Sequence, residues 1–356
     1  MADLNEWLSV DYPNGGGSTI VNLTIQPNYD GDRTQRLKIQ GLKKTVFVDV
    51  AQSVANTEEI DREYFYIHFE EPNSSFKIEP FRGDDATFVL DIDYSFDGVN
   101  WEKKLVNRYQ PTFTLGNNKR IYLRNNTKTL NSDVKDTTYQ IELKNRAKVG
   151  GNILSLAEDN NFAHLFRYNT YLTDASNLIF PDYVERNCYA SMFIGCTNLL
   201  YPPQLPATVL AEHCYESMFT ECTNLQYAPE LPATTLGNGC YENMFSGCTS
   251  LVTAPDLPAT NLAIFCYRRM FYACTSLVNA PQLPAKVLQN SCYSYMFNGC
   301  TNLQYIKMLG VSYIEKNITY WVENVSPTGT FVKKKGVTFL TGVSGIPDGW
   351  EVIEID

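Results

Sequence analysis

The chain has 356 residues, which is too long for one ordinary hydrophobic core and predicts two to four domains. Apolar residues make up 44% and charged residues 19% of the chain, so it is a folded protein and not a disordered tail. The net charge of −10 argues against nucleic-acid binding, because phosphate binding needs a basic surface.

The first residues of the chain have none of the features of an export signal. Residues 1–7 contain neither a basic region nor an apolar stretch, and no apolar run approaches the ~18 residues needed to span a bilayer. We therefore expect no membrane insertion. The protein would stay in the cytoplasm or leave by cell lysis, unless a signal was removed.

Residues 1–54 contain short strands of alternating character. We expect strands at 20–25, 36–39 and 45–50, separated by turns rich in glycine and aspartate. With the preceding segment Trp7 to Val10, this pattern resembles a BACON domain, a small β-sandwich of Bacteroides-type bacteria and crAss-like phages. The resemblance implies either carbohydrate binding or a spacer role.

Residues 55–149 form a second strand-rich stretch. The expected strands are at 64–69, 88–94, 101–106, 112–115, 120–124 and 139–143. Asp97-Gly98 is a hairpin-turn dipeptide. The run from Tyr94 and Ser95 through this turn to Trp101 resembles an immunoglobulin-like (Ig-like) segment that precedes certain bacterial repeats, which implies a second β-sandwich.

The ten cysteines define an internal repeat. Their spacing alternates between 8 and 18, which gives a period of 26 and five full copies at 188–303. Each copy reads C-Y-x-x-M-F-x-x-C-T-[NS]-L, and four copies continue into Leu-Pro-Ala. Cys240, Met244, Phe245 and Cys248 have the spacing of one face of a short helix. Because one coil cannot bury its apolar face alone, we expect coils to stack with identical side chains in columns.

Stacking would place the cysteines in buried columns, where a reduced thiol packs as a small hydrophobe. Disulfides between coils remain an alternative, although parallel side chains rarely reach the required geometry. A metal site is another, but His213 is the only histidine nearby. The repeated tyrosines would form a further column that either stacks between coils or contacts a ligand, and they are Tyr189, Tyr215, Tyr241, Tyr267 and Tyr293.

The repeat resembles a known family. Met218, Phe219, Cys222 and Leu225 resemble the Ala-Phe-x-x-Cys-x-x-Leu core of the BspA-like leucine-rich repeats of bacterial surface proteins, with Met in place of Ala. The longer variant, with the period seen here, is typical of Bacteroides-type bacteria and their phages, and the resemblance covers residues 150–356. It implies a surface protein with an adhesive solenoid.

Atypical units are expected at both ends of the array, because a solenoid must close its open core. Leu165 and Phe166 mark an opening coil, Ile318 to Val322 a last relic, and residues 331–355 a β cap. The predicted fold is mainly β with an α/β solenoid. The domains are a BACON-like β-sandwich at 1–54, an Ig-like β-sandwich at 55–149, BspA-like leucine-rich repeats at 150–310 and a C-terminal cap at 311–356.

The sequence has no nucleophile elbow, P-loop or HExxH motif, and its three histidines are far apart. We therefore predict that the protein is not an enzyme and has no cofactor, catalytic residue or bound metal. Calcium binding at Asp30 and Asp32, or at Asp91 and Asp93, is an alternative to a turn and a strand face.

The repeats predict a binding surface. From Cys188 to Leu303 only nine residues are charged, so Tyr, Asn, Thr, Ser and Gln must cover the coils, as in adaptable protein-binding surfaces. The candidate ligand-binding residues occupy the variable columns, and they are Tyr201, Tyr227, Thr253, Asn279, Tyr305, Arg268, Arg269 and Tyr295.

These features favour a non-enzymatic adhesion protein at a phage virion surface, as a fibre or decoration protein. The alternatives are a bacterial cell-surface adhesin whose export signal was removed, and an accessory domain of a glycan-degrading system. The expected partners are a host-cell or mucin glycan or protein, and other virion proteins through the N-terminal domains. A homo-oligomer such as a trimer is a further expectation, although no heptad repeat supports it.

Overall fold

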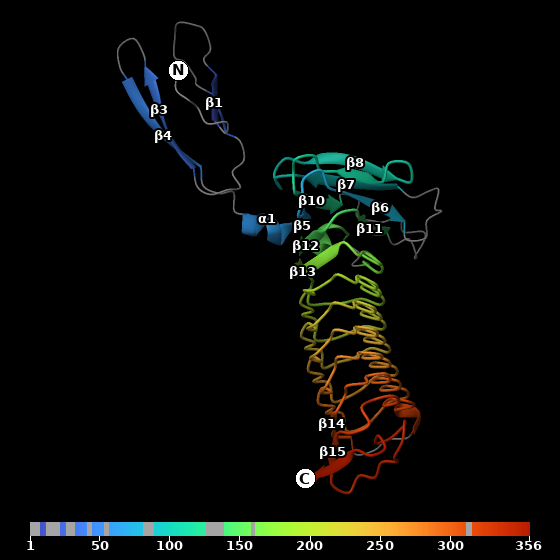
Figure 1. Ribbon diagram of the computed structural model, residues 1–356. Helices are drawn as coiled ribbons and strands as arrows, with labels where there is room; N and C mark the ends of the chain where they lie inside the picture. The colour runs from blue at the N-terminus through green and yellow to red at the C-terminus, as the bar shows by residue number, and fades with distance from the viewer. Residues whose placement is uncertain are drawn as a thin grey trace. The chain divides into compact units, whose positions relative to one another are not determined.

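The computed structural model describes residues 8–11, 22–25, 33–40, 45–52, 57–80, 89–125, 139–157, 161–310 and 315–356, with side chains from residue 59 onward. The chain divides into two units, residues 1–62 and 63–356 (Figure 1). The described residues are mostly β, and α1 (Thr57–Glu63) is the one α-helix among them.

The N-terminal unit contains two antiparallel strand pairs. β1 (Leu8–Asp11) pairs with β2 (Asn22–Ile25), and β3 (Arg33–Gln40) pairs with β4 (Thr45–Gln52). The three strands expected at 20–25, 36–39 and 45–50 are therefore present with small shifts of their ends. The predicted turns between them, including Asp30 and Asp32, lie outside the described residues.

The second unit begins with two sheets. Its first strands are β5 (Phe65–Phe69), β6 (Ser75–Pro80), β7 (Val89–Ser95), β8 (Glu102–Asn107), β9 (Thr112–Thr114), β10 (Arg120–Asn125), β11 (Tyr139–Leu143) and β12 (Ala147–Asn152). One sheet has the order β13-β12-β5-β10-β7-β8 and the other β11-β6-β9, where β13 is Leu172–Ile179. The ring of Phe76 stacks with those of Phe69 and Phe113, at 6.3 and 4.7 Å between centroids, so the core gathers rings from both sheets. All six strands expected in this region are confirmed.

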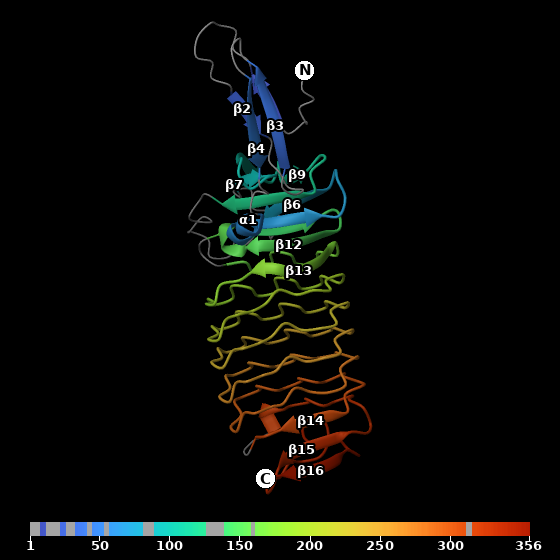
Figure 2. The ribbon, with the colours of Figure 1, turned by 90° about the vertical axis from the view of Figure 1, so that its left-hand side faces the viewer.

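The larger sheet continues into the solenoid through β12. This strand pairs antiparallel with β5 on one side and parallel with β13 on the other. The boundary predicted at 149/150 falls inside β12, and one continuous core extends from Phe65 to Trp350. The two sheets therefore close the first coil of the repeats, as Figure 2 shows at β12 and β13.

The short helix predicted in each repeat is wrong. In the coil from Gly239 to Cys248, alternate N–H groups bond three residues back, as from Met244 to Tyr241 at 3.2 Å. The N–H groups between them donate to the next coil, as from Phe245 to the oxygen of Met270 at 2.9 Å. A helix would satisfy all of these groups within one coil, whereas this arrangement joins each coil to the next. The solenoid is therefore built from turns and isolated parallel bridges.

A backbone signature explains these turns. Gly239, Asn243 and Gly247 have φ values of 59°, 56° and 75°, so every fourth residue is left-handed. The same three positions have positive φ in every full copy. Apolar residues four apart fit this four-residue turn as well as they fit a helix, so the spacing alone does not distinguish the two.

Identical side chains stack in columns, as predicted. Phenylalanine rings of neighbouring coils, from Phe193 to Phe297, are 5.5–5.8 Å apart between centroids and within 8° of parallel. The tyrosine rings from Tyr189 to Tyr293 are 5.8–5.9 Å apart. Both columns are buried, so the tyrosine column stacks between coils and offers no ring face to a ligand.

Both ends of the array are closed by altered coils. Phe166 stacks on Phe193 in the opening coil with centroids 5.6 Å apart, and Trp321 covers Phe297 at the other end at 6.1 Å. The β cap consists of the parallel strands β14 (Tyr305–Met308), β15 (Thr330–Lys334) and β16 (Glu351–Ile355). Short 3-10 turns lie at η1 (Ile153–Ser155) and η2 (Glu315–Asn317).

Candidate binding surfaces on the solenoid

The first variable column lies on the outside of the coils. Tyr201 and Tyr227 are 57% and 60% exposed, Thr253 and Asn279 are also exposed, and Tyr305 is half-buried. Parallel bridges join Tyr227 to Thr253 and Asn279 to Tyr305. The column is therefore a regular row of solvent-facing side chains on successive coils.

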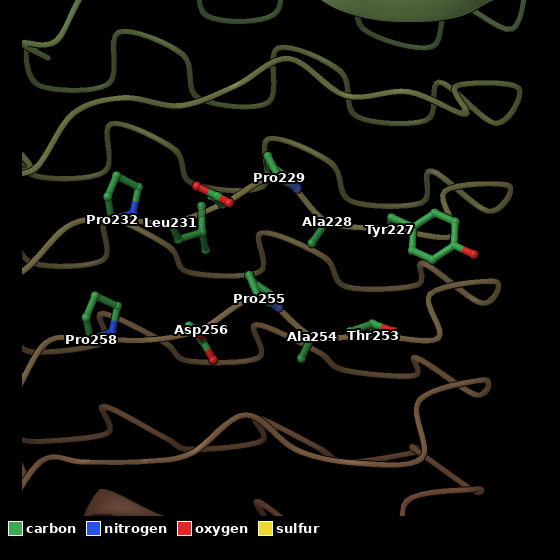
Figure 3. Close-up of a pocket in the computed structure, with 11 residues that line it drawn as sticks. Tyr227, Ala228, Pro229, Leu231, Pro232, Thr253, Ala254, Pro255, Asp256 and Pro258 are labelled. Atoms are coloured by element: carbon green, nitrogen blue, oxygen red, sulfur yellow. The ribbon is translucent and has the colours of Figure 1, made fainter.

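A groove of about 370 Å³ opens beside this column (Figure 3). Residues 227–232 of one coil line it together with residues 253–256 and Pro258 of the next. Pro229 and Pro255 occupy equivalent positions in the two coils, and proline has no N–H to donate to a neighbouring strand. The backbone pairing at the bridge between Tyr227 and Thr253 therefore stops at the prolines. The groove lies along the segments that come after this bridge in the two coils.

The groove is acidic. Glu230 and Asp256 are exposed and lie in its lining, whereas the equivalent residues of the neighbouring copies are Gln204 and Gln282. No lysine or arginine occurs among its lining residues, all of which belong to the described part of the chain. The lining therefore offers hydrogen-bond acceptors and apolar proline rings beside one exposed tyrosine.

The other three predicted site residues belong to the turn segment of the coils. Arg268 donates to Oε1 of Glu242 at 2.9 Å. The guanidinium of Arg269 lies 5.0 Å from the centroid of the Tyr295 ring, which stacks on Tyr320 at 5.6 Å. None of the three lines the groove. The structure therefore brings Tyr227 and Thr253 together in the groove lining. Outside that lining, Arg268 pairs with Glu242 and Arg269 lies beside Tyr295.

A group of titratable residues was missed in the sequence. His213, Glu216 and Glu242 each offer a ligand atom, and these atoms lie within 4.8 Å of one another. Burial raises the pKa of Glu242, the charge of Glu216 raises it further, and Arg268 and His213 oppose the rise. The sequence does contain a pattern that points to this group. One copy has His213-x-x-Glu216, and the next copy has a second glutamate, Glu242, at the position equivalent to Glu216.

The cysteines are free and buried in all five copies. Burial raises the pKa of Cys196 and of Cys300 to about 12, and it raises the pKa of the other eight thiols as well. Because the thiolate is the reactive form, these thiols are poor nucleophiles and poor metal ligands in the folded chain. The reduced packing role is confirmed, and the disulfide alternative is wrong.

The structure gives another role to Asp93, which with Asp91 was the second alternative for calcium binding. Asp93 is buried on β7 and accepts hydrogen bonds from Nε and a terminal nitrogen of Arg124, both at 3.1 Å. Its carboxylate is therefore part of an ion pair within the sheet.

No protein-family model, curated protein or solved structure matches the chain. The resemblances to BspA-like repeats and to a BACON domain therefore rest on the sequence motifs given above. Within the described residues, no helix has both the length and the apolar character to cross a membrane.

Proposed function

We propose that this protein is a non-enzymatic glycan-binding protein that holds its ligand in the groove between Tyr227–Pro232 and Thr253–Pro258. The observation that supports this most directly is the exposed ring of Tyr227 at one end of an acidic, proline-lined groove. The groove volume of about 370 Å³ falls in the range of small-molecule sites.

Tyr227 provides a rigid amphipathic surface. A tyrosine ring has an apolar face that can cover the C–H face of a sugar, and it loses little conformational entropy on binding. Its neighbours Ala228 and Pro229 add apolar area without charge. A pyranose ring lying on this surface would still direct hydroxyl groups toward the acceptors of the groove.

Glu230 and Asp256 set the charge of the ligand. Carboxylates accept hydrogen bonds from hydroxyl groups, and such charge-assisted bonds are stronger than neutral ones. The same carboxylates repel sulfated or carboxylated sugars. We therefore favour a neutral glycan over an anionic one.

The exposed column extends the proposed binding site across several coils. Tyr201, Asn279 and Tyr305 continue the row of Tyr227 and Thr253 onto coils on either side, and adjacent strands lie about 4.8 Å apart. A ligand that runs across the coils could therefore contact several members of the row. This supports an extended chain of sugars rather than a single residue.

We place the protein at a phage virion surface, with the N-terminal modules attaching it to other virion proteins. The β modules and a repeat that resembles those of Bacteroides-type bacteria and their phages support this placement. A bacterial cell-surface adhesin and an accessory domain of a glycan-degrading system would use the same groove. Purified particles of the phage that encodes the chain should contain it. Its absence from them would rule out the virion assignment and leave the groove proposal standing.

The groove is tested by binding of the full chain to an array of neutral and acidic glycans and to host cells. The full chain is required because a cut at 149/150 would divide β12. Replacing Tyr201 and Tyr227 together by alanine should weaken capture at least tenfold without lowering the melting temperature. Tyr109→Ala is the matched control, since Tyr109 is 80% exposed on the β-sandwich. Equal capture by the double variant and the control would contradict the proposal.

A further inference from the structure

Residues His213, Glu216 and Glu242 lie on the turn segment of two adjacent coils. Nδ1 of His213 is 2.9 Å from Oε2 of Glu216, three residues later in the same coil. Glu242 occupies the position of Glu216 in the next coil, one repeat period later. The solenoid stacking therefore brings the second carboxylate to the first, and the three ligand atoms lie within 4.8 Å of one another.

The glycine at position 239 creates the room for this arrangement. Gly239 takes the position of His213 in the next coil and has a φ of 59°. A Cβ atom at this position would lie 2.5 Å from both Nδ1 and Cε1 of His213, and 3.4 Å from Oε2 of Glu242. Any larger residue would therefore push the imidazole away from the two carboxylates. Both ligand atoms border the space that the glycine leaves.

Arg268 orients the deeper carboxylate. Its Nη1 lies 2.9 Å from Oε1 of Glu242, which is only 8% exposed. Nδ1 of His213 is shielded from solvent and faces Oε2 of Glu216 at 2.9 Å. Buried polar atoms nearly always have a partner, and ligating carboxylates are commonly held by a second hydrogen bond of this kind.

We propose that His213, Glu216 and Glu242 bind one divalent transition-metal ion, of which Zn²⁺ fits the donor set best. Imidazole nitrogen and carboxylate oxygens are ordinary zinc ligands at about 2.0–2.2 Å, and water completes a tetrahedral shell. His213 would bind through neutral Nδ1, with its proton on Nε2. The two carboxylates and Arg268 leave one net negative charge, which favours a cation.

The ion would join two coils at one edge of the solenoid. The other copies place Ala190, Arg268 and Ser294 at the position of the two glutamates. The site therefore occurs once in the five full copies.

The test uses the reduced full-length chain with Co²⁺ as a spectroscopic probe and Zn²⁺ as a competitor. One Co²⁺ should bind per chain, with weak visible bands from nitrogen and oxygen ligands and no thiolate charge-transfer band, and Zn²⁺ should displace it. Glu216→Gln and His213→Gln should each weaken Zn²⁺ binding more than tenfold, because even outer-shell changes cost about 10- to 100-fold.

Glu216→Gln leaves the Arg268–Glu242 pair in place, so it tests the site even where Glu242→Gln unfolds the coil. Glu230→Gln and His164→Gln are matched controls that should bind as the parent does. Saturating Zn²⁺ should raise the melting temperature of the parent but not of Glu216→Gln. A thiolate band, unchanged affinity in Glu216→Gln and His213→Gln, or no binding at millimolar Zn²⁺ would each overturn the proposal.

Discussion

Sγ of Cys222 donates a hydrogen bond to the main-chain oxygen of Phe193 in the preceding coil, at 3.1 Å. The same oxygen accepts the N–H of Cys196 within its own coil at 3.0 Å. Equivalent thiol bonds link Cys248 to Phe219, Cys274 to Phe245 and Cys300 to Phe271. The second cysteine of each copy thus fills a column and also bonds its coil to the one before.

This bond predicts different effects for two replacements of Cys222. Cys222→Ala removes buried volume and the donor, and should lower the free energy of unfolding by about 1–3 kcal/mol. Cys222→Ser keeps a donor for the Phe193 oxygen, so it should cost less than the alanine. Urea unfolding followed by circular dichroism compares the two. A serine variant that is the less stable of the pair would contradict a bonding role for the thiol.

Alkaline pH should destabilise the protein strongly. Burial raises the pKa of Cys196 and Cys300 to about 12 in the folded chain. An unfolded thiol titrates near pH ~8.5. Below the pKa of the unfolded thiol, the thiols are protonated in both states and the free energy of unfolding keeps its full value. It falls as pH rises toward 12, because only the unfolded chain loses its protons there. Each such thiol should cost about 1.4 kcal/mol per pH unit in that range.

The measurement is the urea midpoint between pH 7 and pH 11. It should fall steeply above about pH 9, where thiols begin to ionise in the unfolded chain. Thiol titration is the control, since a thiol reagent at pH 8 should modify all ten cysteines in urea and few in the native chain. A urea midpoint that stays constant to pH 11 would show that the thiols are accessible in the folded state.

The left-handed positions predict different effects of substitution at two equivalent sites. Gly247 has a φ of 75°, and Ala273 has a φ of 57° at the same position of the next coil. A side chain in the left-handed region costs about 1–2 kcal/mol, while glycine adopts it freely. Gly247→Ala should therefore lower the melting temperature.

Ala273→Gly should raise the melting temperature or leave it unchanged, because relief of strain competes with the greater freedom of glycine in the unfolded chain. The atoms nearest to a Cβ at position 247 would be Cγ of Glu221 at 3.4 Å and backbone atoms of Glu221 at 3.6 Å, which is ordinary contact, so a clash does not explain the loss. Equal destabilisation by both changes would contradict the turn geometry.

The sequence predicts the columns well because the buried positions recur with the same period as the sequence repeat. Cys, Met, Phe and Leu recur at the same positions of every full copy, and stacked coils require the same residue at the same depth. The helix was predicted wrongly because residues four apart share a face in a helix and also in a succession of four-residue turns. The deciding feature, a positive φ at residues such as Asn243, has no unique sequence signal.

The candidate sites were predictable only in part. Tyr227 and Thr253 were identified because a variable column on an outer strand must face solvent. The groove beside them depends on missing backbone pairing at Pro229 and Pro255, which the repeat pattern alone does not reveal. The group around His213 joins two copies of the repeat and needs a known stacking register before its members can be matched.

The phenylalanine column carries the last prediction. The ring of Phe245 lies between those of Phe219 and Phe271, with centroids 5.7 Å away on each side, and it is fully buried. Phe245→Ala removes both stacking contacts and leaves a cavity that the rigid coils cannot easily close. It should lower the free energy of unfolding by about 3–5 kcal/mol.

Phe245→Leu is the conservative partner of this change. It keeps most of the buried volume without the ring, so it should cost less than alanine and separate the loss of packing from the loss of stacking. Tyr227→Ala is the surface control, because its ring is exposed and should contribute little to stability. Chemical unfolding of all three variants gives the comparison. If Phe245→Ala were as mild as Tyr227→Ala, the coils would not depend on a continuous aromatic column. The repeat would then be held mainly by its hydrogen bonds between coils.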